Sequence, residues 1–127
     1  MIANTTKYGI KALMYLAKVP DEKYVQVLEL SKKINVPGPY LGKIIKALAR
    51  QNIVLTKKGA LGGVTLPTKK RKITLYEICS ALQDPVVISE CFLSGKTCSI
   101  LAPCPVHNKW KDVREAVIAF LKTVPIS

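Results

Sequence analysis

The sequence predicts a mainly α-helical fold in which a short β-hairpin follows the third of five helices. Three observations support this prediction. Apolar residues repeat at helical spacing, a cluster of glycines separates two β-prone runs, and a heptad pattern occupies the end of the chain. With 127 residues, 49% of them hydrophobic, the chain can bury its own core. We expect a folded domain over residues 1–83, a loop over 84–107 and a C-terminal helix over 108–127.

Two amphipathic helices are predicted in the first third of the chain. Residues 5–18 carry apolar side chains at i, i+3, i+4 and i+7, and residues 27–34 form a shorter helix. The apolar positions are Ile10, Leu13, Met14 and Ala17 in the first helix and Val27, Leu30 and Ile34 in the second. The segment 35–40, which contains a glycine and two prolines, ends the second helix, and Pro39 suits the first turn of a third.

The third helix, predicted over residues 39–51, has an apolar face and a cationic face. At about 100° per residue, its aliphatic side chains fall within an arc of about 100°, and its basic side chains fall within about 60° on the opposite side. The aliphatic residues are Leu41, Ile44, Ile45 and Leu48, and the basic residues are Lys43, Lys46 and Arg50. An ordinary surface helix usually mixes charges of both signs, so this arrangement favours an anionic partner.

A β-hairpin is predicted directly after this helix. Residues 53–57 and 64–66 are the two strands, and a glycine-rich turn lies between them. Two helices, a cationic helix and a basic hairpin are the element order of a winged helix-turn-helix. In that fold the third helix enters the major groove and the hairpin, or wing, lies along the backbone or minor groove. The residues expected to contact DNA are Tyr40, Lys43, Lys46, Arg50, Lys57, Lys58, Gly59, Gly62 and Gly63.

Positive charge is concentrated in the same part of the chain. The chain has 20 Lys and Arg against 8 Asp and Glu, a formal net charge of +12, and no acid lies between Glu29 and Glu77. A run of one sign is often only a solvated face, but so long an interval without an acid favours a phosphate-binding surface. No apolar run approaches the roughly 20 residues of a membrane-spanning helix, so we expect a cytoplasmic protein.

A fourth helix is predicted over residues 74–82. Thr74 and Glu77 have the spacing of a capping box, in which each side chain accepts from the backbone N–H of the other residue. Cys79 lies one turn from Leu75 and three residues from Leu82. We therefore expect it to be a buried apolar thiol rather than a metal ligand.

The last helix is predicted to begin near Asn108, a suitable N-cap residue. Its apolar residues are spaced 3, 4, 3 and 4 apart, which is the a/d seam of a coiled coil. They are Trp110, Val113, Val117, Phe120 and Val124. The seam could pack on its own domain, but its regularity favours a homodimer, which would present two recognition helices to a palindromic DNA site.

Three cysteines and the one histidine of the chain lie close together, as Cys91-x6-Cys98-x5-Cys104-x2-His107. A reducing compartment disfavours a disulfide, and a catalytic cysteine has no evident triad partner. Structural zinc is possible by ligand count, but it usually uses closely spaced C-x2–4-C pairs. An iron–sulfur cluster is larger than one ion, so widely spaced thiolates can surround it, and an imidazole ligand would raise its reduction potential.

Five segments occur together in a specific order: "TTKYGIKALMYLA", "VPGPYLGKIIKALARQNIV", "KKGALGGVTL", "ITLYEICSAL" and the three-cysteine segment that ends in His107. With them, nearly the whole chain resembles the family of bacterial iron–sulfur winged-helix transcription regulators that includes IscR and NsrR. The resemblance implies a homodimer in which Cys91, Cys98, Cys104 and His107 bind an iron–sulfur cluster, with [2Fe-2S] favoured over [4Fe-4S]. It places that site between the DNA-binding domain and the dimerisation helix.

We therefore expect a DNA-binding transcriptional regulator, with repression favoured, whose DNA affinity is switched by the cluster. Gly42 stands where the family often has a carboxylate, so the resemblance does not identify the operator. A metal-free or thiol-switched regulator of the same fold is one alternative. A small iron–sulfur electron carrier is another, although a carrier needs neither the basic interval nor the wing. An enzyme is not expected, because the sequence has no phosphate loop, carboxylate pair or triad.

Overall fold

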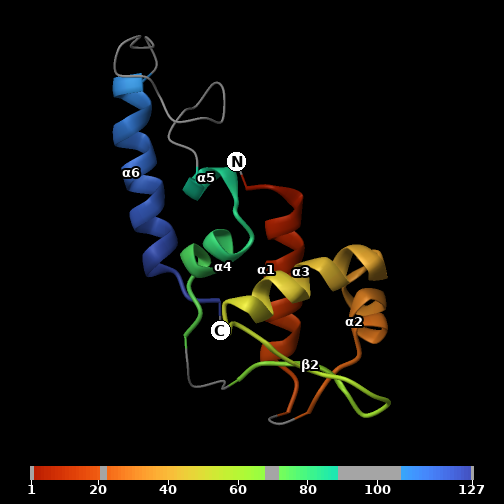
Figure 1. Cartoon of the computed structure of the whole chain (residues 1–127). Coiled ribbons are helices and arrows are strands. Elements are labelled where there is room, and N and C mark those ends of the chain that lie inside the picture. The colour runs from red at the N-terminus through yellow and green to blue at the C-terminus, as the bar shows by residue number, and fades with distance from the viewer. Residues whose placement is uncertain (1, 21–22, 68–71, 89–106, 127) are drawn as a thin grey trace.

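The computed structural model describes residues 2–20, 23–67, 72–88 and 107–126 (Figure 1). Its elements are α1 (Asn4–Ala17), α2 (Val27–Ile34), α3 (Gly38–Arg50), β1 (Leu55–Lys57), β2 (Gly63–Thr65), α4 (Leu75–Ala81), α5 (Pro85–Ile88) and α6 (His107–Thr123). The mainly α-helical prediction is confirmed. Helices α1, α2 and α3 pack together beside the hairpin, and α6 stands on the far side of α4 and α5. Among the described residues, no helix combines the length and apolarity needed to cross a membrane.

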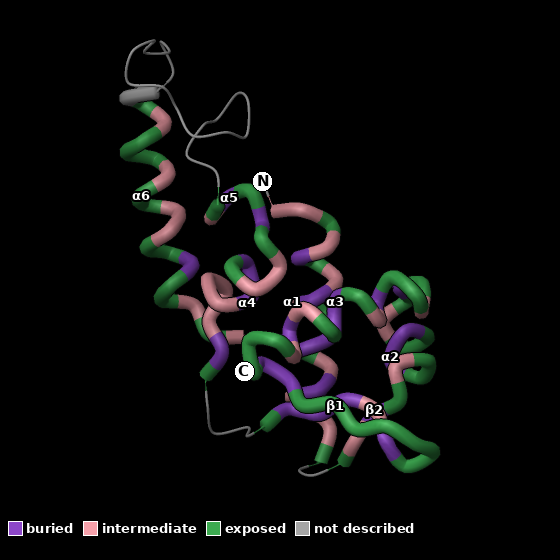
Figure 2. The backbone as a smooth tube through the Cα atoms, in the orientation of Figure 1, coloured by how far each residue is buried: buried purple, intermediate pink, exposed green. Residues whose placement is uncertain are grey.

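The main core lies between α1, α2, α3 and the inner side of the hairpin (Figure 2). The predicted apolar face of α3 is confirmed, since all four of its aliphatic side chains are at most 2% exposed. The predicted pattern of α1 is partly wrong, because Met14 is 46% exposed while Thr6, Gly9 and Leu16 are buried. The reason is close packing at Gly9, where an added Cβ would lie 2.7 Å from Cδ1 of Leu82.

The hairpin is shorter than predicted and is joined by a third segment. β1 and β2 pair antiparallel, with Thr56 opposite Val64. Val64 also bridges to Val25, in the segment before α2, through backbone hydrogen bonds of 2.9 and 2.8 Å. Gly63 has a φ of 137°, and a side chain there would collide with the Val25 carbonyl. The wing is therefore held against the helical domain at its base.

The C-terminal elements correct the predicted loop. The first half of the capping box is confirmed, because Thr74 Oγ1 accepts a hydrogen bond of 3.2 Å from the Glu77 N–H. Residues 85–88, predicted as loop, form the short helix α5, since Asp84 Oδ1 accepts from the Val86 N–H at 2.9 Å and Pro85 suits a first helical turn. Helix α6 already includes residue 107, so Asn108 is inside the helix rather than its N-cap.

The last residues of the chain are extended rather than helical. The Leu75 N–H donates to the Val124 carbonyl at 3.1 Å, and the Ile126 N–H donates to the Ile73 carbonyl at 2.8 Å. Val124, the last position of the predicted heptad seam, therefore lies beyond α6. Its backbone instead ties the end of α6 to the start of α4.

Candidate nucleic-acid interface

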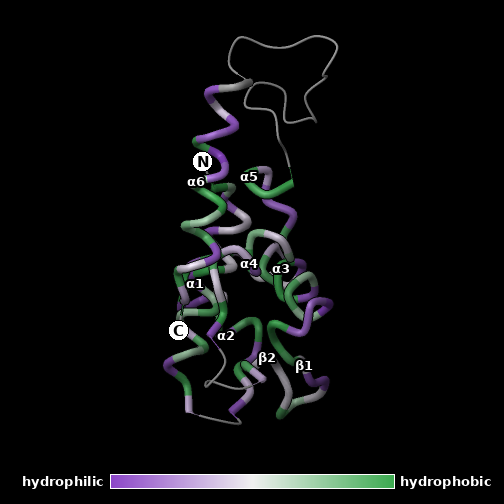
Figure 3. The backbone as a smooth tube through the Cα atoms, turned by 90° about the vertical axis from the view of Figure 1, so that its left-hand side faces the viewer, coloured by the Kyte–Doolittle hydropathy of each residue, from purple (hydrophilic) through white to green (hydrophobic). Residues whose placement is uncertain are grey.

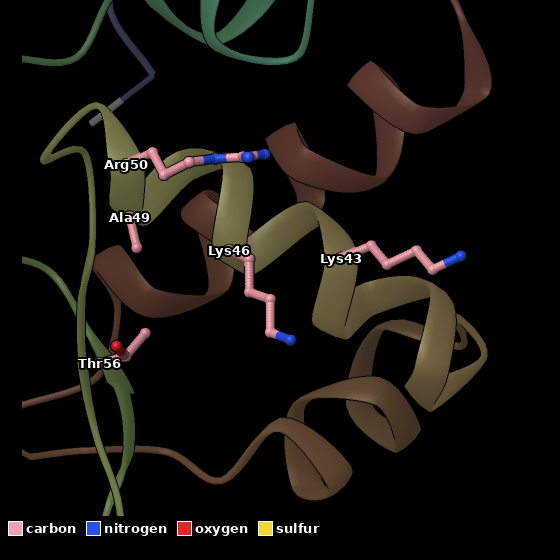
Figure 4. A pocket seen from close by; sticks show the side chains of 5 residues that line it. All are labelled: Lys43, Lys46, Ala49, Arg50 and Thr56. Carbon is pink, nitrogen blue, oxygen red and sulfur yellow. The ribbon is translucent and has the colours of Figure 1, made fainter.

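The cationic face of α3 consists of Lys43, Lys46 and Arg50, and all three side chains are exposed. Figure 4 shows the three side chains extending from α3. Together with Ala49 of α3 and Thr56 of β1, they line a hollow of about 640 Å³. The opposite side of the helix is buried in the main core, so the helix cannot rotate without exposing aliphatic side chains. Burial of one face therefore fixes the direction of the positive charges on the other.

The wing adds positive charge beside this face. Lys57 and Lys58 are exposed at the end of β1, and the Lys57 Nζ lies 5.9 Å from the centre of the Tyr24 ring. At the turn, Gln26 Nε2 donates a hydrogen bond of 2.7 Å to the Ala60 carbonyl. These contacts connect the wing tip to the segment before α2 and restrict its position relative to α3.

The three glycines of the wing have different surroundings. Gly59 is exposed at the turn, with φ 103°, and can approach a ligand closely. Gly62 is buried, and a Cβ there would collide with the Lys57 carbonyl. Because Gly62 is buried, the direct DNA contact predicted for it is not supported, and its role is to shape the turn. Gly63 is partly exposed and occupies the tight approach to Val25 described above.

Tyr40 lies at the edge of the cationic face that borders α1. The residue is 40% exposed, and its ring meets the Tyr8 ring edge-on, with 5.6 Å between ring centres and 82° between planes. Its hydroxyl oxygen lies 2.6 Å from Thr5 Oγ1. Sequence reasoning included Tyr40 among the DNA contacts but missed its two partners on α1.

The predicted cluster ligands Cys91, Cys98 and Cys104 lie outside the described residues, as does the side chain of His107. His107 itself is the first residue of α6. Within the described ranges, no three His, Cys, Asp or Glu side chains are placed to hold a metal ion. Helix α5 ends at Ile88 and α6 begins at His107, and the ligand set itself stays a prediction.

Cys79 is buried as predicted, with no exposed surface. Burial, together with the nearby negative charge of Asp84, raises the pKa of its thiol from 9.0 to about 11. Because a thiolate is the form that binds metals and attacks oxidants, this cysteine stays protonated and unreactive near neutral pH.

Asp84 is a buried carboxylate that sequence reasoning missed. It is 1% exposed, and its Oδ2 accepts hydrogen bonds from Thr6 Oγ1 at 2.6 Å and from the Ala3 N–H at 3.0 Å. Because its Oδ1 caps α5, this carboxylate joins the start of α1 to the helix that leads into the cysteine segment. The only signal in the sequence is Asp before Pro, which is typical of an N-cap.

Helix α6 packs on its own domain through one side only. Leu121 is 2% exposed against α4 and α5, with Val117 and Ile118 beside it. Arg114 Nη2 donates a hydrogen bond of 2.7 Å to the Val87 carbonyl, so α6 is also attached to α5. The predicted seam is thus divided, because Val117 packs inward while Val113 and Phe120 are 50% and 57% exposed. An apolar hollow of about 350 Å³ lies here, lined by Ile2, Val86, Val113, Ala116, Val117, Phe120 and Leu121.

Three packed helices with an exposed cationic third helix and a basic hairpin define a winged-helix DNA-binding protein. The sequence matches, over residues 2–127, the model of the Rrf2 family, whose description is iron-dependent transcriptional regulator. The chain belongs to the Rrf2 family of transcriptional regulators.

Individual relatives agree with this assignment. The chain is 33% identical over 128 residues to a candidate HTH-type transcriptional regulator of Aquifex aeolicus, covering 99% of this chain and 88% of the relative. The T. potens IscR structure has a TM-score of 0.75 at 20% identity and covers 99% of this chain and 82% of that one. The structure of CymR, the global cysteine regulator of B. subtilis, has a TM-score of 0.73 at 22% identity, with 99% and 92% covered. These structures confirm the winged-helix fold, and the family consists of transcriptional regulators, not enzymes.

Proposed function

We propose that this regulator binds a palindromic DNA operator as a homodimer in the cytoplasm and acts as a repressor. We further propose that an iron–sulfur cluster held by Cys91, Cys98, Cys104 and His107 sets its affinity for DNA. The observation that carries the DNA-binding part is the exposed cationic face of α3, fixed in direction by a fully buried opposite face. Lysine and arginine on such a helix can neutralise backbone phosphates and reach base edges in the major groove.

The homodimer is supported by the apolar side of α6. Val113 and Phe120 are exposed at the hollow described above, and exposed apolar side chains that lie together favour association. A second copy of α6 would bury them around a two-fold axis and place two copies of α3 on one duplex. Replacing Phe120 by Ser should raise the dimer dissociation constant roughly tenfold, measured by analytical ultracentrifugation. The unfolding of the isolated chain should change little, and an unaltered dimer would contradict this interface.

The cluster is supported by the chemistry of the donor set. Three thiolates and an imidazole are ligands that iron–sulfur clusters accept, and Cys79 is excluded because it is buried and protonated. A bound cluster would supply an inorganic centre whose loss or change of redox state alters the constraint on these four residues. A structural change at the cluster would reach the DNA-binding region through contacts of the chain itself. Asp84 links α5 to α1, and Arg114 links α6 to α5. The resulting change in the free energy of DNA binding could not exceed the difference in the cluster's binding free energy between the two protein conformations.

Purification without oxygen tests this assignment. We expect visible absorption, iron and acid-labile sulfide in the wild type and in a Cys79→Ala control, and none in a Cys91, Cys98 and Cys104→Ala triple variant. The triple variant should also bind a DNA operator with a different affinity from the wild type. Equal affinity and specificity of the two proteins would reject the switch and leave DNA binding intact.

A thiol-switched regulator of the same fold is the second candidate. Solved structures of similar fold include an oxidised form of the S. aureus regulator CymR, and three cysteines in one segment could also form reversible disulfides. A colourless protein without iron or sulfide, whose DNA affinity changes after mild oxidation, would favour this candidate.

A further inference from the structure

A continuous row of side chains runs from α1 to the edge of the cationic face. The Lys11 Nζ lies 5.9 Å from the centre of the Tyr8 ring, and that ring packs edge-on against Tyr40. The Tyr40 hydroxyl in turn pairs with Thr5 Oγ1 at 2.6 Å. The two ends of the row are accessible, since Lys11 is exposed and the hydroxyl pair is at the surface.

The hydroxyl pair has a proton to donate outward. Each hydroxyl carries one hydrogen, and the bond between the two uses only one of them. The second hydrogen can therefore be donated to an external acceptor, and a hydroxyl that already accepts a hydrogen bond is a stronger donor. Residues 1–20 contain no Asp or Glu, so an acceptor at this surface meets no carboxylate on α1. This chemistry fits an anionic oxygen such as that of a phosphate.

The row borders the path that a duplex would follow along α3. At about 100° per residue, Tyr40 lies about 60° around the helix from Lys43, between the cationic face and the buried face. It is turned toward α1, as its contacts with Thr5 and Tyr8 show. A DNA backbone that contacts Lys43 therefore passes next to the hydroxyl pair.

We propose that the Thr5 and Tyr40 hydroxyls together bind one phosphate of the DNA backbone, that Lys11 contacts a neighbouring phosphate, and that Tyr8 is a positioning residue that holds Tyr40 and Lys11 in place. This inference rests on the proposed DNA binding and extends the interface to α1, a helix otherwise assigned only to the scaffold. A contact to phosphate adds affinity without adding sequence preference.

The experiment measures binding to a fluorescein-labelled DNA duplex of mixed sequence between about 50 and 200 mM salt. Thr5→Val and Tyr40→Phe should each weaken binding roughly fivefold. The double variant should lose about as much affinity for the duplex as the weaker-binding single variant, because both substitutions remove the same contact. Thr5→Ser, which keeps the hydroxyl, should bind like the wild type. Lys11→Gln should reduce the steepness of the salt dependence by about 0.9 per protomer, and the matched control Lys18→Gln, directly after the last residue of α1, should not.

Two further measurements distinguish a failure of the proposed DNA binding from a failure of the α1 contact alone. They are the affinity of Lys46→Gln and the thermal unfolding of the variants. If the wild type does not bind the duplex, or Lys46→Gln has no effect, the proposed DNA binding through α3 is wrong. If Lys46→Gln weakens binding while Thr5→Val, Tyr40→Phe and Lys11→Gln bind like the wild type, only the α1 contact is overturned. It is also overturned if Thr5→Val lowers the unfolding temperature and Lys11→Gln leaves the salt dependence unchanged, because the row would then be purely structural.

Discussion

The two regions of this molecule, α1–α3 with the wing and α4–α6 at the C-terminal side, differ in how completely each buries its apolar side chains. Among the described residues, the core centred on α1–α3 contains sixteen buried apolar residues, whereas the cluster between α4, α5 and α6 contains only Cys79, Val86 and Leu121. Figure 3 shows α6 with hydrophobic and hydrophilic residues alternating along its length. Its apolar residues do not all face the same small core, since Val113 and Phe120 are 50% and 57% exposed.

What the two regions expose follows from this difference. The first region presents charge, with Lys43, Lys46 and Arg50 pointing to solvent. In the second region, Val113 and Phe120 are 50% and 57% exposed beside an apolar hollow. A region with a complete core can offer an electrostatic surface to a polyanion, while a region with an incomplete core gains stability from a second apolar surface. This contrast supports the proposed DNA contact on the side of α3 and the proposed dimer contact on the side of α6.

The largest effect is expected from removing the charge of the cationic face. Replacing Lys43, Lys46 and Arg50 together by Gln should weaken duplex binding about a hundredfold at 0.1 M salt and flatten the salt dependence by about 2.7 per protomer. The matched control removes the same charge from α6 by changing Lys109, Lys111 and Lys122 to Gln. Titration by fluorescence anisotropy checks both variants. Equal losses in the two would mean that net charge, rather than the face of α3, controls binding.

The next effect compares the two cores by deleting one leucine from each. Leu48 and Leu121 are 0% and 2% exposed. Leu48→Ala should lower the free energy of unfolding by about 3–5 kcal/mol, since the surrounding core is closed and cannot collapse into the cavity. Leu121→Ala should cost nearer 2 kcal/mol, because the smaller cluster opens onto a hollow and can relax. Urea unfolding of dilute protein measures both, and equal costs would contradict the contrast between the regions.

A smaller effect is expected at the contact that joins the regions. Thr6→Val removes a hydrogen bond to the buried Asp84 carboxylate and should lower the free energy of unfolding by about 1.5–3 kcal/mol. Thr6→Ser should restore most of this stability. The neighbouring Thr5→Val should change it by less than about 0.5 kcal/mol, since the Thr5 hydroxyl is at the surface. If denaturant midpoints shift equally for the two Val variants, Asp84 does not have the linking role assigned to it.

The last effect, which appears only at alkaline pH, is a dependence of stability on the ionisation of Cys79. Its folded pKa is raised from 9.0 to about 11, so the unfolded chain loses this proton first as the pH rises. The stability that the thiol contributes is therefore complete below pH 9 and is lost between pH 9 and about 11. Relative to Cys79→Ala, the wild type should lose on the order of 2 kcal/mol across that range. If the free energies of unfolding of the two proteins change in parallel with pH, the thiol of Cys79 does not have a raised pKa in the folded protein.

The features predicted best from the sequence are those that a single segment contains. The two faces of α3, the ends of α2 and the burial of Cys79 follow from the spacing of apolar and charged residues within one or two helical turns. The cationic part of the candidate site was predictable for the same reason. One buried face determines where every other side chain of that helix points.

The features that the sequence did not predict depend on contacts between distant residues. The buried side of α1 is determined by the close packing of Gly9 against Leu82. A glycine has no apolar side chain, so the spacing of apolar residues does not indicate that it is buried. The contacts of Asp84 with Ala3 and Thr6 span 81 and 78 residues. The Tyr40–Thr5 pair spans 35 residues, so the sequence alone predicts α1 only as part of the scaffold.

The sequence by itself determined where α1, α2, α3 and α4 lie, which face of α3 carries charge and which cysteines stand close to His107 along the chain. Only the tertiary structure decided that α6 divides its apolar residues between its own domain and solvent, and that a buried carboxylate joins α1 to α5. The physical reason is that helical periodicity is a local property, whereas burial of a polar group or of a small residue depends on the partner that chain folding brings to it.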